Sequence, residues 1–80
     1  MKFELFKQVG LARDIPDKNL RRGDVAVVVD HHPAVQGEVG YSIEVFNALG
    51  DTILVTAVPE SFLQELSADE ILHVRSLRSA

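Results

Sequence analysis

The run Val25–Val29 constrains the fold of this chain more than any other feature of the sequence. Four of its five residues are valine. β-Branched side chains are restricted in a helix but pack well on the pleated surface of a sheet. Both faces of the run are apolar, which indicates a central strand covered on both sides. We therefore expect a β protein built around these residues.

Three further segments carry strand signals, and turn residues separate them. We expect these strands at residues 8–13, 41–46 and 52–58. Tyr41, Ile43 and Val45 alternate with polar residues, which indicates a strand with one buried face. Residues 14–19 and 31–40 contain proline, glycine, asparagine or aspartate and are predicted to be loops.

Glycine marks the tightest connections. Gly23, followed by Asp24, predicts a turn directly before the central strand. Glycine adopts conformations that other residues avoid, and an aspartate side chain accepts a backbone hydrogen bond. Gly50 predicts a hairpin at residues 47–51. Gly10 indicates a bulge or a close approach of two backbones within the first strand.

The chain after Pro59 carries mixed signals. Pro59 cannot donate to a strand ladder, so it should end the strand before it and start a helical turn within residues 59–66. Ser67 and Glu70 have the spacing of a capping box, which predicts one helical turn there. Residues 71–77 fit either an extension of that helix or a short last strand, and we favour the strand.

These elements predict a mainly β fold, a small SH3-like barrel of five strands with a short helical turn near the C-terminus. Short strands joined by tight turns would expose unpaired edges in a flat sheet, whereas curling buries their valine-rich faces together. Residues 1–80 are expected to form this single domain. Because so small a core leaves little net stability, self-association is also expected.

Composition narrows the function classes. The formal charge of −4 argues against a nucleic-acid partner, because binding phosphates needs a basic surface. The absence of cysteine excludes disulfides and thiolate chemistry. The longest strongly apolar run is far too short to cross a membrane, and the N-terminus lacks a signal-peptide pattern. We therefore expect a cytoplasmic protein without membrane contact.

No catalytic motif occurs in the sequence. Its serines lie outside the nucleophile-elbow and Ser-x-x-Lys patterns, and there is no phosphate-binding glycine motif. A filled barrel also leaves little room for a pocket. We therefore expect no enzymatic activity and no cofactor.

Asp30, His31 and His32 are the strongest candidates for metal ligands in the sequence, because carboxylate and imidazole groups bind transition metals. Neighbouring side chains on an extended chain point apart, so a further ligand such as His73 would have to converge on them. We predict that no metal is bound and that these are exposed loop histidines. A small metal-binding protein remains an alternative.

Several motifs together resemble one bacterial family. They are an acidic-aliphatic-proline loop at residues 14–16, an aliphatic-x-x-Gly-Asp turn at 20–24 before the valine strand, and a Tyr-x-Ile-Glu strand at 41–46 that ends in a glycine-containing hairpin. The family is known only as a domain of unknown function. The resemblance spans roughly residues 9–66 and implies an SH3-like barrel, with no reaction attached.

A second resemblance is to the KOW segment of ribosomal and transcription-elongation proteins, through residues 23–28 and 37–39. It implies nucleic-acid binding, which is the main alternative function. Where the KOW segment carries lysine, glycine and arginine, residues 29–36 hold no lysine or arginine. The basic groups that could contact phosphates, if they fold together, are Lys18, Arg21 and Arg22 with Arg75 and Arg78.

The function predicted from these observations is a noncatalytic interaction module that binds another protein or a second copy of itself. Its size and acidity also suit an antitoxin- or immunity-type protein. Candidate contacts are the 31–40 loop, an exposed sheet edge and the apolar side chains of the C-terminal segment. That last set is Phe62, Leu63, Leu66, Ile71, Leu72 and Val74. Closure of the barrel by the same side chains is the competing interpretation.

Overall fold

Five strands and two short 3-10 turns make up the fold in the computed structural model, which describes residues 2–35 and 37–78. The strands are β1 (Gln8–Leu11), β2 (Val25–Val35), β3 (Glu38–Phe46), β4 (Thr52–Pro59) and β5 (Leu63–Gln64). The turns are η1 (Pro16–Lys18) and η2 (Glu60–Phe62). No helix in the described part of the chain is long and apolar enough to cross a membrane.

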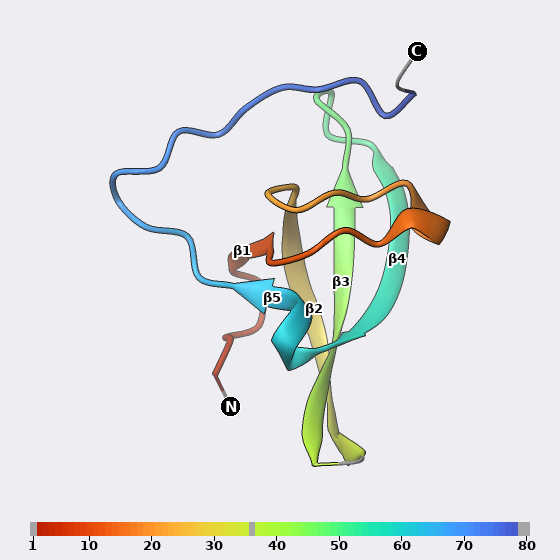
Figure 1. Ribbon diagram of the computed structural model, residues 1–80, viewed down its shortest axis with the longest axis vertical. Coiled ribbons are helices and arrows are strands. Elements are labelled where there is room, and N and C mark those ends of the chain that lie inside the picture. The colour runs from red at the N-terminus through yellow and green to blue at the C-terminus, as the bar shows by residue number, and fades with distance from the viewer. Residues whose placement is uncertain (1, 36, 79–80) are drawn as a thin grey trace.

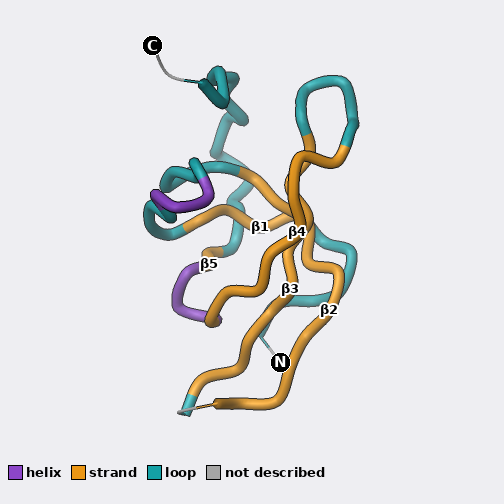
Figure 2. The backbone as a smooth tube through the Cα atoms, turned by 90° about the vertical axis from the view of Figure 1, so that its right-hand side faces the viewer, coloured by secondary structure: helices purple, strands orange, loops and turns teal. Residues whose placement is uncertain are grey.

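The strands connect in the SH3-like pattern. A long loop, residues 12–24, joins β1 to β2, and two hairpins join β2, β3 and β4. The last strand, β5, returns to pair with β1, so the antiparallel order is β4-β3-β2-β1-β5. The sheet curls into a half-barrel (Figure 1), and its two hairpins project from opposite ends (Figure 2). The mainly β, SH3-like fold expected from the sequence is confirmed.

The core lies on the inner face of the curled sheet. Tyr41, Ile43 and Val45 are buried there, as their alternation along β3 predicted. β2 contributes Ala26 and Val28 from its inner face. The other buried hydrophobic residues are Phe3, Val9, Leu11, Ile15, Leu20, Val58 and Leu63.

The valine-rich strand is central, but its two faces differ. β2 lies between β1 and β3, as predicted. On its outer face, however, Val25, Val27 and Val29 are only half-buried. The prediction that both faces are covered is therefore wrong for the outer face, because within residues 2–35 and 37–78 no sheet or helix packs there and an extended C-terminal segment passes over it.

The segment predicted as a loop, residues 31–40, instead continues the β2–β3 hairpin. His31 pairs with Tyr41, and the register becomes irregular between His32 and Val35. Pro33 is tolerated because β1 pairs only with residues 25–27 of β2. The far half of β2 therefore has an open side, where proline removes no ladder hydrogen bond. The loop prediction is wrong here, and its residue 36 lies outside the described residues.

Near the two ends of the chain, some predicted elements are present and others are not. β1 is present but ends at Leu11, two residues earlier than predicted for 8–13, and the helical turn after Pro59 is confirmed as η2. Residues 67–70 form a turn in which the Glu70 carboxylate accepts the Ser67 backbone N–H, but the turn is not helical, so the helical turn predicted there is wrong. The strand predicted for residues 71–77 is wrong, since these residues form neither strand nor helix and make no backbone hydrogen bonds to the rest of the described chain.

Tyr41 closes the half-barrel by joining three segments. Its hydroxyl donates a hydrogen bond to Glu60 Oε2 at 2.6 Å. The same oxygen accepts the backbone N–H groups of Lys2 at 3.2 Å and Phe3 at 3.3 Å. The Phe3 ring packs edge-on against the Tyr41 ring, with centroids 5.4 Å apart. One buried side chain therefore links the N-terminal segment, β3 and η2.

Candidate interaction surface

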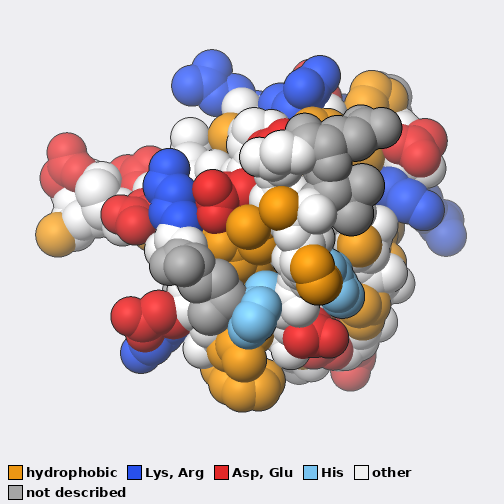
Figure 3. Space-filling view, turned by 90° about the horizontal axis from the view of Figure 1, so that it is seen from below, with side chains coloured by type: hydrophobic (Ala, Val, Ile, Leu, Met, Phe, Trp, Pro, Cys, Tyr) orange, Lys and Arg blue, Asp and Glu red, His pale blue; other side chains and the backbone are white. Residues whose placement is uncertain are grey.

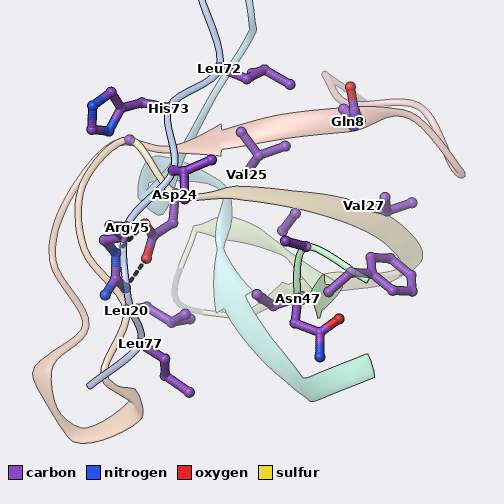
Figure 4. A pocket seen from close by; sticks show the side chains of 16 residues that line it. Gln8, Leu20, Asp24, Val25, Val27, Asn47, Leu72, His73, Arg75 and Leu77 are labelled. Atoms are coloured by element: carbon purple, nitrogen blue, oxygen red, sulfur yellow. Dashed lines mark hydrogen bonds and ion pairs between the residues drawn. The ribbon is translucent and has the colours of Figure 1, made fainter. Parts of the chain in front are cut away.

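The residues after β5 form an extended tail, residues 65–78, that contains no helix or strand (Figure 1). A groove of about 350 Å³ lies between the tail and the outer face of β2. Its lining includes Val25 and Val27 of β2 and Leu72 and Val74 of the tail (Figure 4). The tail therefore covers part of the apolar face that the sheet itself leaves open.

One ion pair, the latch, anchors the tail. Arg75 donates from Nε to Asp24 Oδ1 at 2.8 Å and from Nη2 to Asp24 Oδ2 at 2.5 Å, which is a bidentate contact. Arg75 Nη2 also donates to the Asn19 carbonyl oxygen at 2.8 Å. No backbone hydrogen bond joins residues 71–78 to the rest of the described chain. Side-chain contacts alone therefore hold this part of the tail.

Asp24 has two structural roles. Its Oδ2 accepts the Arg21 backbone N–H at 2.8 Å, which caps the turn where Gly23 has a φ of +91°. Burial alone would raise the pKa of Asp24, but the hydrogen bonds from Arg75 and from the Arg21 backbone outweigh burial and lower it below 3.8. The carboxylate therefore stays charged, and both the turn and the latch persist, at neutral pH.

The residues predicted from the sequence as an apolar interface divide into two groups. Leu63 belongs to the core, and the half-buried Phe62 packs against it. Leu66 is half-buried and lies against Gly10, where a Cβ would come 3.2 Å from Leu66 Cδ2. The remaining three, Ile71, Leu72 and Val74, are exposed on the tail. The first group closes the half-barrel, whereas the side chains of the second group are largely exposed to solvent.

A second exposed apolar surface, on β4, carried no distinctive sequence signal. Ile53, Val55 and Ala57 are exposed on this strand, while Val58 is buried and the residues between them are half-buried. Their alternation with inward side chains matches any half-buried strand, so the sequence alone does not identify this surface. Its significance comes from the position of β4 at the edge of the sheet.

The histidines do not converge. His31 is exposed, whereas His32 is half-buried and its Nε2 lies 2.7 Å from Ser42 Oγ. His73 lies on the tail beside the groove (Figure 4). Within residues 2–35 and 37–78, no three His, Asp or Glu side chains come close enough to hold a metal ion. At the end of the molecule seen in Figure 3, histidines lie beside hydrophobic side chains, with charges of both signs around them.

The latch also brings the two basic segments of the sequence together. Arg75 reaches Asn19 and Asp24, so the tail lies next to the part of the 12–24 loop that holds Lys18, Arg21 and Arg22. Carboxylates are interspersed in that loop, and Asp14 accepts the Arg22 backbone N–H at 2.8 Å. The surface is therefore of mixed charge, and the Arg75 charge is already paired.

Comparison with known families matches residues 5–65 to the family described as Domain of unknown function (DUF4926). No curated protein and no solved structure gives a significant match. The matched residues run from before β1 to just past β5, so they include every strand of the half-barrel. Because the match covers most of the 80 residues, the chain belongs to the DUF4926 family.

Proposed function

We propose that this chain is a noncatalytic module that binds another protein through its tail. The observation that carries the proposal is the exposure of the tail's apolar side chains, which is 91% for Ile71, 57% for Leu72 and 82% for Val74. Apolar groups clustered in this way mark interaction surfaces more often than scattered ones do. The tail lies after the last strand, so a partner can engage it without opening the sheet.

The partner that fits this tail is a basic protein with an apolar groove. Glu65, Asp69 and Glu70 precede the exposed apolar residues, and the whole chain has a charge of −4. An extended segment can dock its apolar side chains in a groove while its carboxylates meet lysine and arginine at the rim. Opposite charges of this kind accelerate association and select partners. An antitoxin- or immunity-type protein that blocks a basic active site is the finer form of this proposal.

A pull-down with matched variants tests the proposal. The affinity-tagged chain, an Ile71→Glu/Val74→Glu variant and a Leu49→Glu control are used as baits in lysate from the source cells, and captured proteins are quantified by mass spectrometry. Leu49 is 87% exposed on the β3–β4 hairpin, so its substitution adds charge away from the tail. We expect one basic protein to bind the wild type and the control but not the tail variant.

Direct binding by purified proteins then completes the test. The tail substitutions should raise the dissociation constant by about tenfold or more, as loss of apolar anchors does. Added salt should slow association. A wild-type chain that captures nothing above background, or a partner that binds the tail variant equally well, would contradict the proposal. If the partner is toxic, and the wild-type chain relieves its toxicity whereas the tail variant does not, the protein acts as an antitoxin.

Nucleic-acid binding is the second candidate, because the latch places the tail beside Lys18, Arg21 and Arg22. The paired Arg75 charge and the interspersed carboxylates make it the weaker of the two. Fluorescence anisotropy with generic RNA and DNA at low salt tests whether the chain binds nucleic acid, because electrostatic affinity is greatest at low salt. Binding that falls steeply with salt would support this function, and no binding at low salt would eliminate it.

A further inference from the structure

The groove beside β2 already holds an extended segment, which is the chain's own tail. Leu72, Arg75 and Leu77 follow one another along it, and Val27 lies on the opposite wall (Figure 4). All the half-barrel residues that line the groove fall within residues 5–65, which match the family, whereas the tail residues in the groove follow that match. The groove is therefore a feature of the domain, and the tail is a peptide segment that lies in it.

A built arginine site lies at one side of this groove. The two carboxylate oxygens of Asp24 accept hydrogen bonds from Nε and Nη2 of Arg75, and the Asn19 carbonyl oxygen accepts a further one from Nη2. The turn itself positions this carboxylate, since Asp24 Oδ2 also accepts the Arg21 backbone N–H. Two donors side by side are the geometry of a guanidinium group, which a lysine ammonium cannot reproduce. The site therefore selects arginine, and it does not depend on the tail for its position.

The tail fills the groove incompletely. Among the described residues, every hydrogen bond that joins residues 71–78 to the half-barrel comes from the Arg75 side chain. Leu72 and Val74 line the groove and yet are mostly exposed. A volume of about 350 Å³ stays unfilled between the tail and β2. A segment with the same arginine and larger apolar side chains would bury more apolar surface there than the tail does.

We propose that this groove binds an extended, arginine-containing segment of a partner protein, and that the tail is the intramolecular competitor of that segment. The arginine is bound by Asp24 and Asn19, and a leucine-sized side chain follows two residues later. Leu77 marks this second position, because it lies beside Leu20 at the end of the groove (Figure 4). The chain's charge of −4 attracts such a cationic segment. The inference goes beyond the proposed function, which uses the exposed side chains of the tail and not the groove beneath it.

Tethering makes the tail a competitor that the partner segment must displace. A segment joined by a short linker acts at an effective concentration of the order of 1 mM. The apparent affinity for a second segment falls in proportion to the fraction of molecules with an open groove. Arg75→Ala removes all the hydrogen bonds that hold residues 71–78 on the half-barrel, and it leaves the wall formed by β2 unchanged. The latch therefore sets how readily a partner segment enters.

An NMR titration with synthetic peptides tests the groove. The isotope-labelled full chain, as wild type and as Arg75→Ala, is titrated with a peptide of residues 71–78, Ile-Leu-His-Val-Arg-Ser-Leu-Arg. We expect the Val25 and Val27 amides to shift, with a dissociation constant about tenfold lower for Arg75→Ala because its groove is open. The same peptide with Arg75→Lys should bind about tenfold more weakly, since lysine cannot make the bidentate contact. A chain with Arg78→Ala is the matched control and should bind like the wild type.

The arginine contact can also be removed from the protein. Asp24→Asn retains an oxygen for the Arg21 N–H but loses the charge, so in the Arg75→Ala chain it should weaken peptide binding. If this variant fails to fold, the lysine peptide tests the same contact. Absence of binding to Arg75→Ala, equal binding of both peptides, or shifts confined to residues outside the groove would overturn the proposal. A wild-type mass that rises with concentration would also overturn it, because the tail of a second copy would then be the occupant. Since the peptides replace the cellular partner, the pull-down remains an independent result.

Discussion

Arg75 and Asp24 lie 51 positions apart in the sequence and meet in a bidentate ion pair that fixes the C-terminal tail to the turn before β2. Because Asp24 also caps that turn, the state of the tail is coupled to a structural element of the sheet. The two roles can be separated by substitution, since Arg75 serves only the tail whereas Asp24 serves both.

Arg75→Ala should release the tail while leaving the half-barrel folded. The ion pair is partly exposed, so its loss should lower the free energy of unfolding by about 1 kcal/mol or less. NMR relaxation should show lower order parameters for residues 71–77 than in the wild type. Arg78→Ala is the matched control, because Arg78 is an exposed cation of the same tail without a hydrogen bond among the described residues. Equal mobility in both variants would show that the latch does not hold the tail.

Acid should open the latch. The pKa of Asp24 is lowered in the folded protein, so its charged form stabilises the fold at pH values above the ordinary value of 3.8. That contribution is lost as the pH falls through the lower, folded-state pKa. Carboxyl-carbon NMR should show Asp24 titrating below 3.8 in the wild type and at higher pH in Arg75→Ala. A titration that is the same in both proteins would contradict the assignment.

Tyr41→Phe should weaken the closure of the half-barrel. The substitution keeps the ring but removes the acceptor of two backbone N–H groups and the donor to Glu60. We expect the free energy of unfolding to fall by about 1–2 kcal/mol, because the Phe3 N–H is then buried without a partner. Urea denaturation measures the change. Glu60→Gln, which retains an acceptor for the hydroxyl, should cost less, and the reverse order would contradict this account.

Gly10 and Leu66 should be energetically coupled. A Cβ on Gly10 would lie 3.2 Å from Leu66 Cδ2. Alanine also restricts the unfolded chain, which favours folding by about 0.4–1 kcal/mol. We therefore expect Gly10→Ala to be close to neutral in the wild type and stabilising in a Leu66→Ala background. A double-mutant cycle with thermal or urea unfolding measures the coupling. Additive effects would show that the side chain of Leu66 does not restrict position 10.

The strands that could be predicted are those whose sequence patterns act locally. Valine density identified β2, alternation identified β3, and Pro59 marked the start of η2. The continuation of β2 past His31 was missed because Pro33 signals a loop. Whether proline is tolerated there depends on which neighbour pairs with that half of β2, and this is a property of the whole sheet.

The tail and the β4 edge could not be predicted for the same reason: local sequence patterns do not show which segments become neighbours in the sheet. Leu72 and Val74 have strand spacing, yet they form no strand, because forming one requires a neighbouring strand to pair with, which local spacing does not report. Similarly, nothing in residues 52–59 distinguishes an edge strand from an inner one. The ion pair between Asp24 and Arg75 was also not predictable, because no local pattern relates residues so far apart in the chain.

The pairing of Gly10 with Gln64 and of Leu11 with Leu63 has a consequence for biosynthesis. A nascent chain carries β1 without its second neighbour until residues 63–64 emerge from the ribosome. Contacts so distant in sequence form slowly, because the intervening chain must first lose its freedom. Until then one side of β1 is unpaired, and crowding of ribosomes on one message would bring such open edges together.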